Sequence, residues 1–194
     1  MSDKSAQKKK YIVETARQVF KEKGYKEVTM KDIVEACDIS RGGLYLYFQN
    51  TREIFEEVLK LEQEDTDDVF EAGIPEQATP SDILALFLKE QKKELLSRKP
   101  SLNKAVYEYF FTEQVHSKNN LLKKQFDAAV YVIERLIEAG VESEEFYCED
   151  PRGAARNIMY VLEGLKIASE TRGVSEAVVD REIMYVMQGL IAEE

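Results

Sequence analysis

Apolar and polar residues follow one another along this chain with the period of an α-helix almost throughout its 194 residues. The segment after Thr29 shows the rule clearly, because Met30, Ile33, Val34 and Cys37 have the spacing i, i+3, i+4, i+7 that places them on one helical face. No convincing alternation over five or more residues indicates a strand. The pattern therefore predicts an all-α protein.

Helix start and stop signals divide the chain into about nine helical segments. Serine, threonine, asparagine and aspartate at the starts provide N-caps, while glycine and proline mark most of the ends. Gly140, for example, is expected to end the seventh helix. The predicted helices cover approximately residues 8–23, 30–37, 41–48, 51–70, 81–96, 100–116, 121–139, 152–172 and 176–191.

Charge is distributed unevenly along the chain, although its total is −10 at neutral pH. Residues 1–50 carry ten Lys and Arg against seven Asp and Glu, a net charge of +3, whereas residues 51–194 carry −13. This asymmetry is expected when only the first segment meets phosphate, because an acidic surface repels nucleic acid. Charge also drifts along chains without consequence, so the asymmetry alone leaves a nucleic-acid partner open.

The predicted second and third helices are separated by only residues 38–40, which is the spacing of a helix-turn-helix motif. In this motif the second helix enters the DNA major groove with its N-terminal residues at base edges. The sequence Arg41-Gly42-Gly43 would start that helix, where a missing Cβ atom lets the backbone approach DNA closely. Arg41 can bind guanine or phosphate, and the hydroxyl groups of Tyr45 and Tyr47 can donate to phosphate oxygens. A purely structural helix corner would leave these residues without explanation.

The segment from Ile12 to Leu59 resembles the N-terminal DNA-binding domain of the TetR family of bacterial transcriptional regulators. Its sequence is IVETARQVFKEKGYKEVTMKDIVEACDISRGGLYLYFQNTREIFEEVL. The shared features are a first helix ending in Phe-x-x-x-Gly-Tyr, a threonine that opens the second helix, and the sequences Ile-Ser-Arg-Gly and Leu-Tyr-x-Tyr-Phe. The remaining residues resemble the family only in length and helical character.

The resemblance implies a three-helix DNA-binding domain at residues 1–50 and a larger helical effector-binding and dimerisation domain at residues 51–194. It also implies a homodimer that binds double-stranded DNA at a palindromic operator, since two subunits present two recognition helices to successive major grooves. The family's DNA contacts carry over to the matching positions, with Arg52 as a further candidate. The predicted DNA-binding residues are Thr29, Ser40, Arg41, Gly42, Gly43, Tyr45, Tyr47 and Arg52.

Several positions depart from the family pattern. The turn residue that is commonly glycine is Asp38, which must then adopt a left-handed backbone conformation. Gly43 stands where the family often has a polar residue, so one base-reading side chain is missing. Leu46 replaces a frequent histidine, and Thr51 replaces a frequent lysine. Arg52 or the lysines at 8–10 can supply part of the lost charge, although such a lysine run also fits a solvated helix start.

Aromatic residues are concentrated in the segment 87–131. The sequence AVYEYFF places rings on almost every face of one helix, which a small helical domain cannot bury without a cavity or a partner. Because aromatic stripes at helical spacing more often belong to a core, the pocket interpretation competes with a structural one. The residues predicted to line an apolar effector pocket are Phe87, Tyr107, Phe110, Phe111, Gln114, Phe126 and Tyr131.

The last two predicted helices carry apolar stripes, and Gly164 and Ala168 are small enough to let helices approach closely. Two such helices from each of two chains would form a four-helix interface. Packing on the core of their own chain is the alternative. The residues predicted for the dimer interface are Ile158, Leu162, Leu165, Ile183, Met187 and Leu190.

Two classes of function fit these predictions. The first is a transcriptional regulator, in particular a repressor that a small, largely apolar effector releases from its operator. The alternative is a DNA-bound structural or division-type factor that a protein partner controls. An enzyme is not expected, because the chain has one histidine and shows no Ser/His/Asp or Cys/His arrangement.

No cofactor or metal is expected, since no group of His, Cys, Asp and Glu has the spacing of metal ligands. Cys37 and Cys148 are expected to be free thiols of a reducing compartment. The chain shows neither an apolar run long enough to span a membrane nor a secretory signal. These features predict a cytoplasmic location and no membrane partner.

Overall fold

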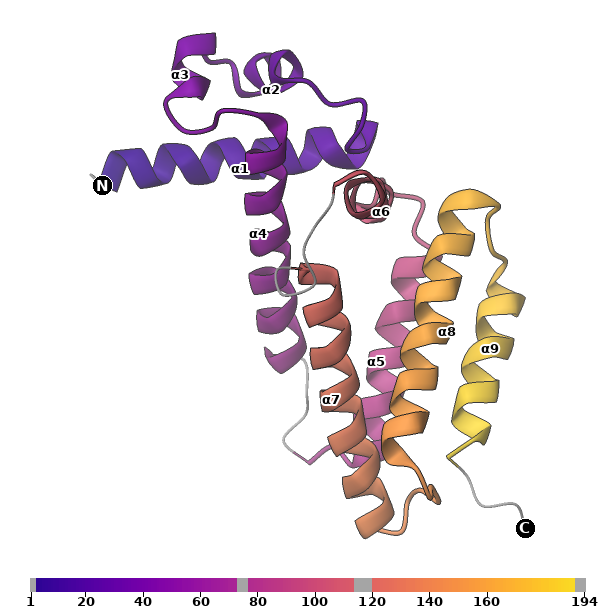
Figure 1. The fold of residues 1–194 in the computed structure, drawn as a ribbon. Coiled ribbons are helices and arrows are strands. Elements are labelled where there is room, and N and C mark those ends of the chain that lie inside the picture. Colours follow the sequence, from indigo (N-terminus) through magenta and orange to yellow (C-terminus); the bar gives the residue numbers. More distant parts are fainter. Residues whose placement is uncertain (1–2, 73–76, 114–119, 191–194) are drawn as a thin grey trace. The chain divides into compact units, whose positions relative to one another are not determined.

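The computed structural model describes residues 3–72, 77–113 and 120–190, and within these ranges it consists of nine α-helices without a strand (Figure 1). The predicted all-α class and number of helices are confirmed. The helices are α1 Asp3–Lys23, α2 Met30–Cys37, α3 Arg41–Tyr45, α4 Thr51–Ala72, α5 Pro80–Leu95, α6 Asn103–Thr112, α7 Leu121–Glu142, α8 Pro151–Thr171 and α9 Glu176–Gln188.

The chain folds into two compact units that do not follow the order of the sequence. Unit 1 combines residues 1–73 with residues 99–115 and contains α1 to α4 together with α6. Unit 2 combines residues 74–98 with residues 116–194 and contains α5, α7, α8 and α9. The polypeptide therefore crosses from one unit to the other three times.

Unit 1 is built around α1, whose apolar stripe packs against α2, α4 and α6. Ile12, Ala16, Val19 and Phe20 form this stripe and are all buried. The short helices α2 and α3 add further apolar side chains to this core, and α4 supplies a third side. The fully buried residues contributed by these helices are Ile33, Leu44, Ile54, Phe55 and Val58.

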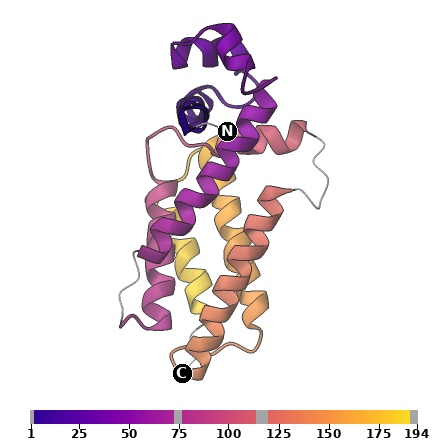
Figure 2. The ribbon, with the colours of Figure 1, turned by 90° about the vertical axis from the view of Figure 1, so that its left-hand side faces the viewer.

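Unit 2 is a bundle in which α5, α7, α8 and α9 run side by side, as both views show (Figures 1 and 2). Its core is entirely apolar among the described residues. Phe146, in the turn after α7, closes one end of this core. The other buried members of the main cluster are Leu84, Leu88, Val130, Ile133, Ile137, Ala155, Ile158, Leu162, Val186 and Leu190.

The ends of the helices differ from the sequence prediction in two places that have a physical reason. α3 ends at Tyr45 and not near residue 48 as predicted, although the ring of Phe48 is buried. α7 continues through Gly140 to Glu142, so the predicted stop at Gly140 is wrong. Gly140 is required by packing instead, because a Cβ atom there would overlap the ring of Phe146.

Both cysteines are free, as predicted, with Cys37 buried in unit 1 and Cys148 packed against the core of unit 2. None of the described helices combines the length and apolar character needed to cross a membrane. The described ranges also hold no group of three or more His, Cys, Asp and Glu able to bind a metal ion.

Candidate nucleic-acid interface

Thr29 and Asp32 form a closed capping box at the start of α2. The backbone N–H of Thr29 donates to Asp32 Oδ2 at 2.8 Å, and the Thr29 hydroxyl donates to the same oxygen at 2.6 Å. The ammonium group of Lys23 lies 2.5 Å from Asp32 Oδ1. Hydrogen bonds from Lys23 and Thr29 hold the pKa of Asp32 well below its usual range. Both donors of Thr29 go to Asp32 in this structure, so its predicted phosphate contact requires one of them to change partner.

Asp38 forms the turn between α2 and α3 with a left-handed backbone, φ 49° and ψ 52°. The conformation predicted from the missing glycine is therefore confirmed. Its N–H still donates to Glu35 O at 3.3 Å, which ends α2 cleanly. A short polar side chain tolerates this region of backbone conformation better than a branched or aromatic one. The turn thereby fixes where α3 begins.

Ser40 caps α3 and leaves the first turn of that helix exposed. Its Oγ accepts a hydrogen bond from the Gly43 N–H at 3.1 Å. A Cβ atom at position 43 would lie 3.2 Å from this oxygen, so glycine relieves crowding at the cap. A Cβ atom at Gly42 would meet nothing within 4 Å. Packing within the chain therefore gives no reason for Gly42, which leaves bare backbone on the surface of α3.

Arg41 is exposed at the start of α3 and forms no ion pair with any described residue. Its guanidinium carbon lies 5.6 Å from the centroid of the Tyr45 ring, within the range of a cation–π contact. Tyr45 and Tyr47 are both half-buried. Leu44, by contrast, is fully buried in unit 1. α3 thus has an apolar inner face and an outer face with one cation that is free to bind an anion.

Arg52 is placed differently from Arg41, because acidic side chains already hold it. Its Nε lies 2.9 Å from Glu56 Oε1, and its Nη1 lies 3.1 Å from Glu113 Oε2. A contact of Arg52 with phosphate remains a prediction, and it would compete with these two carboxylates.

The lysine run at the start of the sequence lies within α1, which begins at Asp3 rather than near Lys8. Lys9 Nζ lies 2.6 Å from Glu57 Oε2 of α4 and 5.6 Å from the Phe48 ring centroid. Lys9 therefore joins α1 to α4. Lys8 lies over the Tyr11 ring at 4.9 Å from its centroid.

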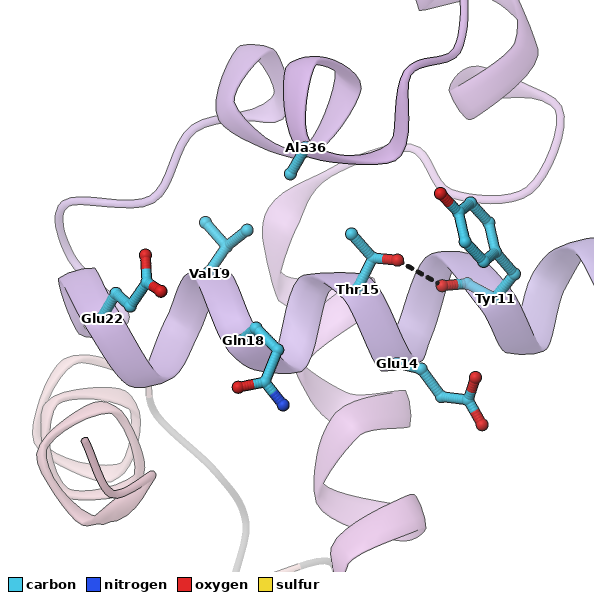
Figure 3. Close-up of a pocket in the computed structure, with 7 residues that line it drawn as sticks. All are labelled: Tyr11, Glu14, Thr15, Gln18, Val19, Glu22 and Ala36. Atoms are coloured by element: carbon cyan, nitrogen blue, oxygen red, sulfur yellow. Dashed lines mark hydrogen bonds between the residues drawn. The ribbon is translucent and has the colours of Figure 1, made fainter. Parts of the chain in front are cut away.

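A shallow groove between α1 and α2 is the other surface feature of this region (Figure 3). Glu14 and Glu22 line it from α1, and Ala36 lines it from α2. Thr15 in the same groove donates its hydroxyl to the Tyr11 carbonyl at 2.9 Å. Because two carboxylates repel phosphate, the groove does not extend the candidate DNA-binding face, which is confined to α3 and its flanks.

Helix α6 joins unit 1 through a cluster of rings that comes from distant parts of the chain. The Phe20 and Phe55 rings are 4.7 Å apart, and Tyr25 stands edge-on to Tyr109 of α6 at 5.1 Å. Aromatic pairs at such distances add specific geometry to the area that they bury. The cluster therefore fixes α6 on α1 and α4.

Hydroxyl–carboxylate hydrogen bonds surround this aromatic cluster. Tyr25 donates to Glu113 Oε1 at 2.7 Å, and Tyr109 donates to Glu56 Oε1 at 2.8 Å. Burial and the bond to Glu113 raise the pKa of Tyr25 above its usual range, and burial with the bond to Glu56 raises the pKa of Tyr109 to about 12. The backbone N–H of Lys26 donates to Glu108 of α6 at 3.0 Å. α6 is thus held by polar and apolar contacts together.

The residues predicted for an effector pocket are divided between the two units. Phe110 lies beside Tyr109 on α6, and Phe111 is 83% exposed on the same helix. In unit 2 Phe87 and Phe126 pack against the core, while Tyr131 is 63% exposed. Tyr107 is half-buried on α6, and Gln114 lies outside the described residues. The pocket therefore stays a prediction.

The residues predicted for the dimer interface face the interior of their own chain. Ile158, Leu162, Leu165 and Leu190 have between 0% and 6% of their surface exposed. Ile183 and Met187 are partly buried and packed against the same core. Side chains with so little free surface cannot provide a partner with substantial contact area. Ile158, Leu162, Leu165 and Leu190 therefore belong to the core of their own chain, while a dimer contact of Ile183 and Met187 stays a prediction.

Sequence reasoning did not find the carboxylates that hold α6. Glu56, Glu108 and Glu113 are scattered acidic residues whose spacing has no pattern, and Glu113 is 88 residues from Tyr25. The only available signal was the pair of tyrosines inside apolar segments, since a buried hydroxyl group needs a polar partner.

A compact three-helix core that presents a short, capped and exposed helix after a tight turn defines a helix-turn-helix DNA-binding protein. The family model described as bacterial regulatory proteins, tetR family, matches residues 12–58, and the model described as tetracyclin repressor-like, C-terminal domain, matches residues 83–179. The HTH-type transcriptional regulator YfiR of Bacillus subtilis is 31% identical over 141 residues, which are 72% of this chain and 68% of YfiR. The chain therefore belongs to the TetR family, whose members are transcriptional regulators and not enzymes.

Solved structures agree in fold. A transcriptional regulator from Saccharomonospora viridis, solved in complex with choline, has a TM-score of 0.83 at 18% identity, with 97% of this chain and all of that chain covered. Reduced NemR of E. coli has a TM-score of 0.78 at 11% identity, with 96% and 100% covered. At these identities the likeness extends to the fold alone.

Proposed function

We propose that this protein is a cytoplasmic, homodimeric repressor that binds a palindromic operator and leaves it when a small molecule binds. The observation that carries the proposal is the exposed outer face of α3. There Ser40 caps the helix, Arg41 has no acidic partner among the described residues, and the backbone at Gly42 is bare. The edge of a DNA groove is anionic. It fits this face because the face offers a cation without an acidic partner and a bare backbone that DNA can approach closely.

Exposed apolar residues on α8 and α9 support the proposed dimer. Tyr160 and Ile167 are 60% and 43% exposed on α8, and Gly164 lies between them with open space where a Cβ atom would be. On α9, Met184 and Tyr185 are 47% and 55% exposed. Such stripes opposite the core suit a helical interface with a second copy, with glycine allowing close approach.

The placement of α6 supports control by an effector. The chain enters α6 from unit 2 and returns to unit 2 after it, while α6 itself is held on α1 and α4. A ligand that favours one arrangement of unit 2 can then act on unit 1 through these connections. Release requires that the ligand bind the DNA-free state more tightly than the DNA-bound state.

Selection of binding sites from random duplexes tests the proposal. A palindrome with half-sites about 10 base pairs apart, or a multiple of this, is expected for a symmetric dimer. Failure to enrich any sequence would overturn the proposal. Enrichment of widely scattered sites away from promoters would instead favour a DNA-bound structural factor controlled by a protein partner.

A second experiment tests the dimer. Ile167→Glu places a charge on the exposed stripe of α8 and is expected to yield monomers in analytical ultracentrifugation. The matched control is Val132→Glu, because Val132 is 51% exposed on α7. Dimers of unchanged stability in both variants would exclude this face.

A thermal-shift screen tests the effector. The compounds should be apolar and cationic small molecules, with choline among them because the Saccharomonospora viridis regulator was solved with it. A true effector both stabilises the free protein and dissociates the selected duplex. Compounds that do only the first would contradict ligand release.

A further inference from the structure

Leu46, directly after α3, is an apolar residue that takes no part in the core of unit 1. Its surface is 82% exposed, whereas Leu44, two residues earlier, is fully buried. Leu44 therefore satisfies the packing of α3, and Leu46 adds nothing to it. Between two half-buried tyrosines, the exposed Leu46 side chain is accessible to a partner outside the chain.

Helix geometry places Leu46 one turn after Gly42. The Leu46 N–H donates to Gly42 O at 3.2 Å, and the Leu46 backbone is still helical at φ −67° and ψ −23°. Residues four apart lie on the same helical face, so Leu46 shares the outer face of α3 with Gly42. Nothing lies within 4 Å of a Cβ atom built at Gly42, so this face of α3 is open beside Gly42, and the Leu46 side chain is itself largely exposed.

We propose that Leu46 reads thymine in the operator by packing its side chain against the 5-methyl group of one thymine in each half-site. This inference rests on the proposed binding of α3 to DNA. The thymine methyl is the apolar feature of the major groove, and it marks A·T pairs without a hydrogen bond. A leucine has no donor for phosphate or base edge, so an apolar contact is what its chemistry offers.

The two glycines make this contact geometrically possible. Side chains at positions 42 and 43 would hold α3 away from the base edges, whereas bare backbone lets the helix approach. A branched side chain one turn further along can then reach the groove floor. In this arrangement Leu46 partly replaces the base-reading side chain that is missing at Gly43.

Replacement of single thymines by deoxyuridine tests the inference, because it removes the methyl group and keeps every hydrogen bond. The full-length protein and its Leu46→Ala variant are titrated with selected duplexes in which each thymine is replaced in turn. For the parent, we expect one thymine per half-site at which replacement weakens binding about fourfold, the effect of one buried methyl group. For Leu46→Ala, the same replacement should change binding by less than about 1.5-fold, as little contact is left to lose.

Two further variants sharpen the result. Leu46→His, which restores a residue frequent in the family, should lose the response to deoxyuridine. Val132→Ala changes an exposed aliphatic residue of unit 2 and should keep the response of the parent. Since Leu46 is exposed, thermal melting should show the same stability for Leu46→Ala and the parent.

Three outcomes would overturn the inference. These are a parent indifferent to the loss of every methyl group, an equal response in the parent and Leu46→Ala, and an equal weakening of Leu46→Ala on selected and random duplexes. Equal weakening on selected and random duplexes would indicate that Leu46 contacts a sugar and does not distinguish between sequences. If the parent selects no sequence at all, the proposed function fails together with this inference. If the parent selects a sequence but does not respond to the loss of a methyl group, only the inference fails.

Discussion

Each unit has an apolar core, but the two units differ in the polar contacts that join their own helices. In unit 1, charged and hydroxyl groups join separate helices, as in the pairs Lys9–Glu57 and Tyr109–Glu56. Arg17 and Glu62 add another such pair between α1 and α4. In unit 2 the helices meet through an apolar core, and the bonds of Lys92 to α9 are the main ion pairs between described helices.

This difference has a physical consequence for each unit. Charge-assisted hydrogen bonds are directional, so they fix helices at defined positions, as a DNA-binding face requires. Apolar contacts have no preferred direction and tolerate small shifts between helices. The contacts of unit 1 therefore fix its helices more closely in direction than the apolar contacts of unit 2 do.

The largest effect is expected from a truncation in the core of unit 2. Leu162→Ala should lower the free energy of unfolding by about 2–5 kcal/mol, because it leaves a cavity among fully buried neighbours. Val132→Ala, on an exposed face of α7, should cost less than about 1 kcal/mol. Chemical denaturation at fixed protein concentration measures both. Equal losses in the two variants would contradict the assignment of Leu162 to the core.

The next effect concerns the free cation of unit 1. Arg41→Ala should weaken binding to the selected operator by about 1–3 kcal/mol and reduce discrimination between sequences, since Arg41 is exposed and has no acidic partner among the described residues. Lys9→Ala should leave the salt dependence of binding unchanged, because Lys9 is paired with Glu57. Titrations at several salt concentrations separate the two roles. A flatter salt dependence in Lys9→Ala would mean that this pair opens on DNA.

A smaller effect is expected where α6 joins unit 1. Tyr109→Phe removes the hydroxyl bond to Glu56 and should cost about 0.5–1.5 kcal/mol of stability. Folding also raises the pKa of Tyr109 to about 12, so its contribution is complete below pH 10 and is lost as the pH rises toward 12. The parent should lose stability more steeply than Tyr109→Phe in that window. Tyr131→Phe, on an exposed face of unit 2, is the control. If stability depended on pH in the same way in Tyr109→Phe and in the parent, the proposed contribution of the Tyr109 hydroxyl group would be contradicted.

The smallest effect comes from the capping box of α2. Asp32→Asn should cost about 0.5–1 kcal/mol at neutral pH through the weakened cap. Because folding lowers the pKa of Asp32, the carboxylate stabilises the protein above its usual pKa near 4, and this contribution is lost as the pH falls further. Urea denaturation at pH 7 and at pH 3 should show the difference between parent and variant shrinking. A difference that grows toward acid would contradict the cause given for the lowered pKa.

Local signals in the sequence were sufficient for much of the fold. Serine, threonine and aspartate were predicted as N-caps at helix starts, and the structure has such caps at Thr29, Ser40, Asp150 and Ser175. A cap can be predicted because it depends only on residues three positions apart. The left-handed conformation of Asp38 followed from the family resemblance, because the matching turn position is commonly glycine. The part of the site that depends on these neighbours could therefore be read from the sequence.

Features that depend on distant residues could not be read in this way. Gly140 has the local signature of a helix stop, but the ring of Phe146 makes it part of a continuous helix. Helix α8 has apolar residues on two faces, and periodicity alone does not say whether Leu162 or Tyr160 meets its own chain. The hydrogen bond from Tyr25 to Glu113 joins parts of the chain that no sequence pattern connects.

The position of α6 also bears on how such regulators can be recombined. A fragment that ended after α4 would lose Tyr109, whose ring packs against Phe55 and Tyr25, and would leave Glu56 without its hydroxyl partner. A DNA-binding module transplanted onto another sensor should therefore bring residues 99–115 with it. In practice a chimaera needs a graft at three junctions, because the portable module is discontinuous in sequence.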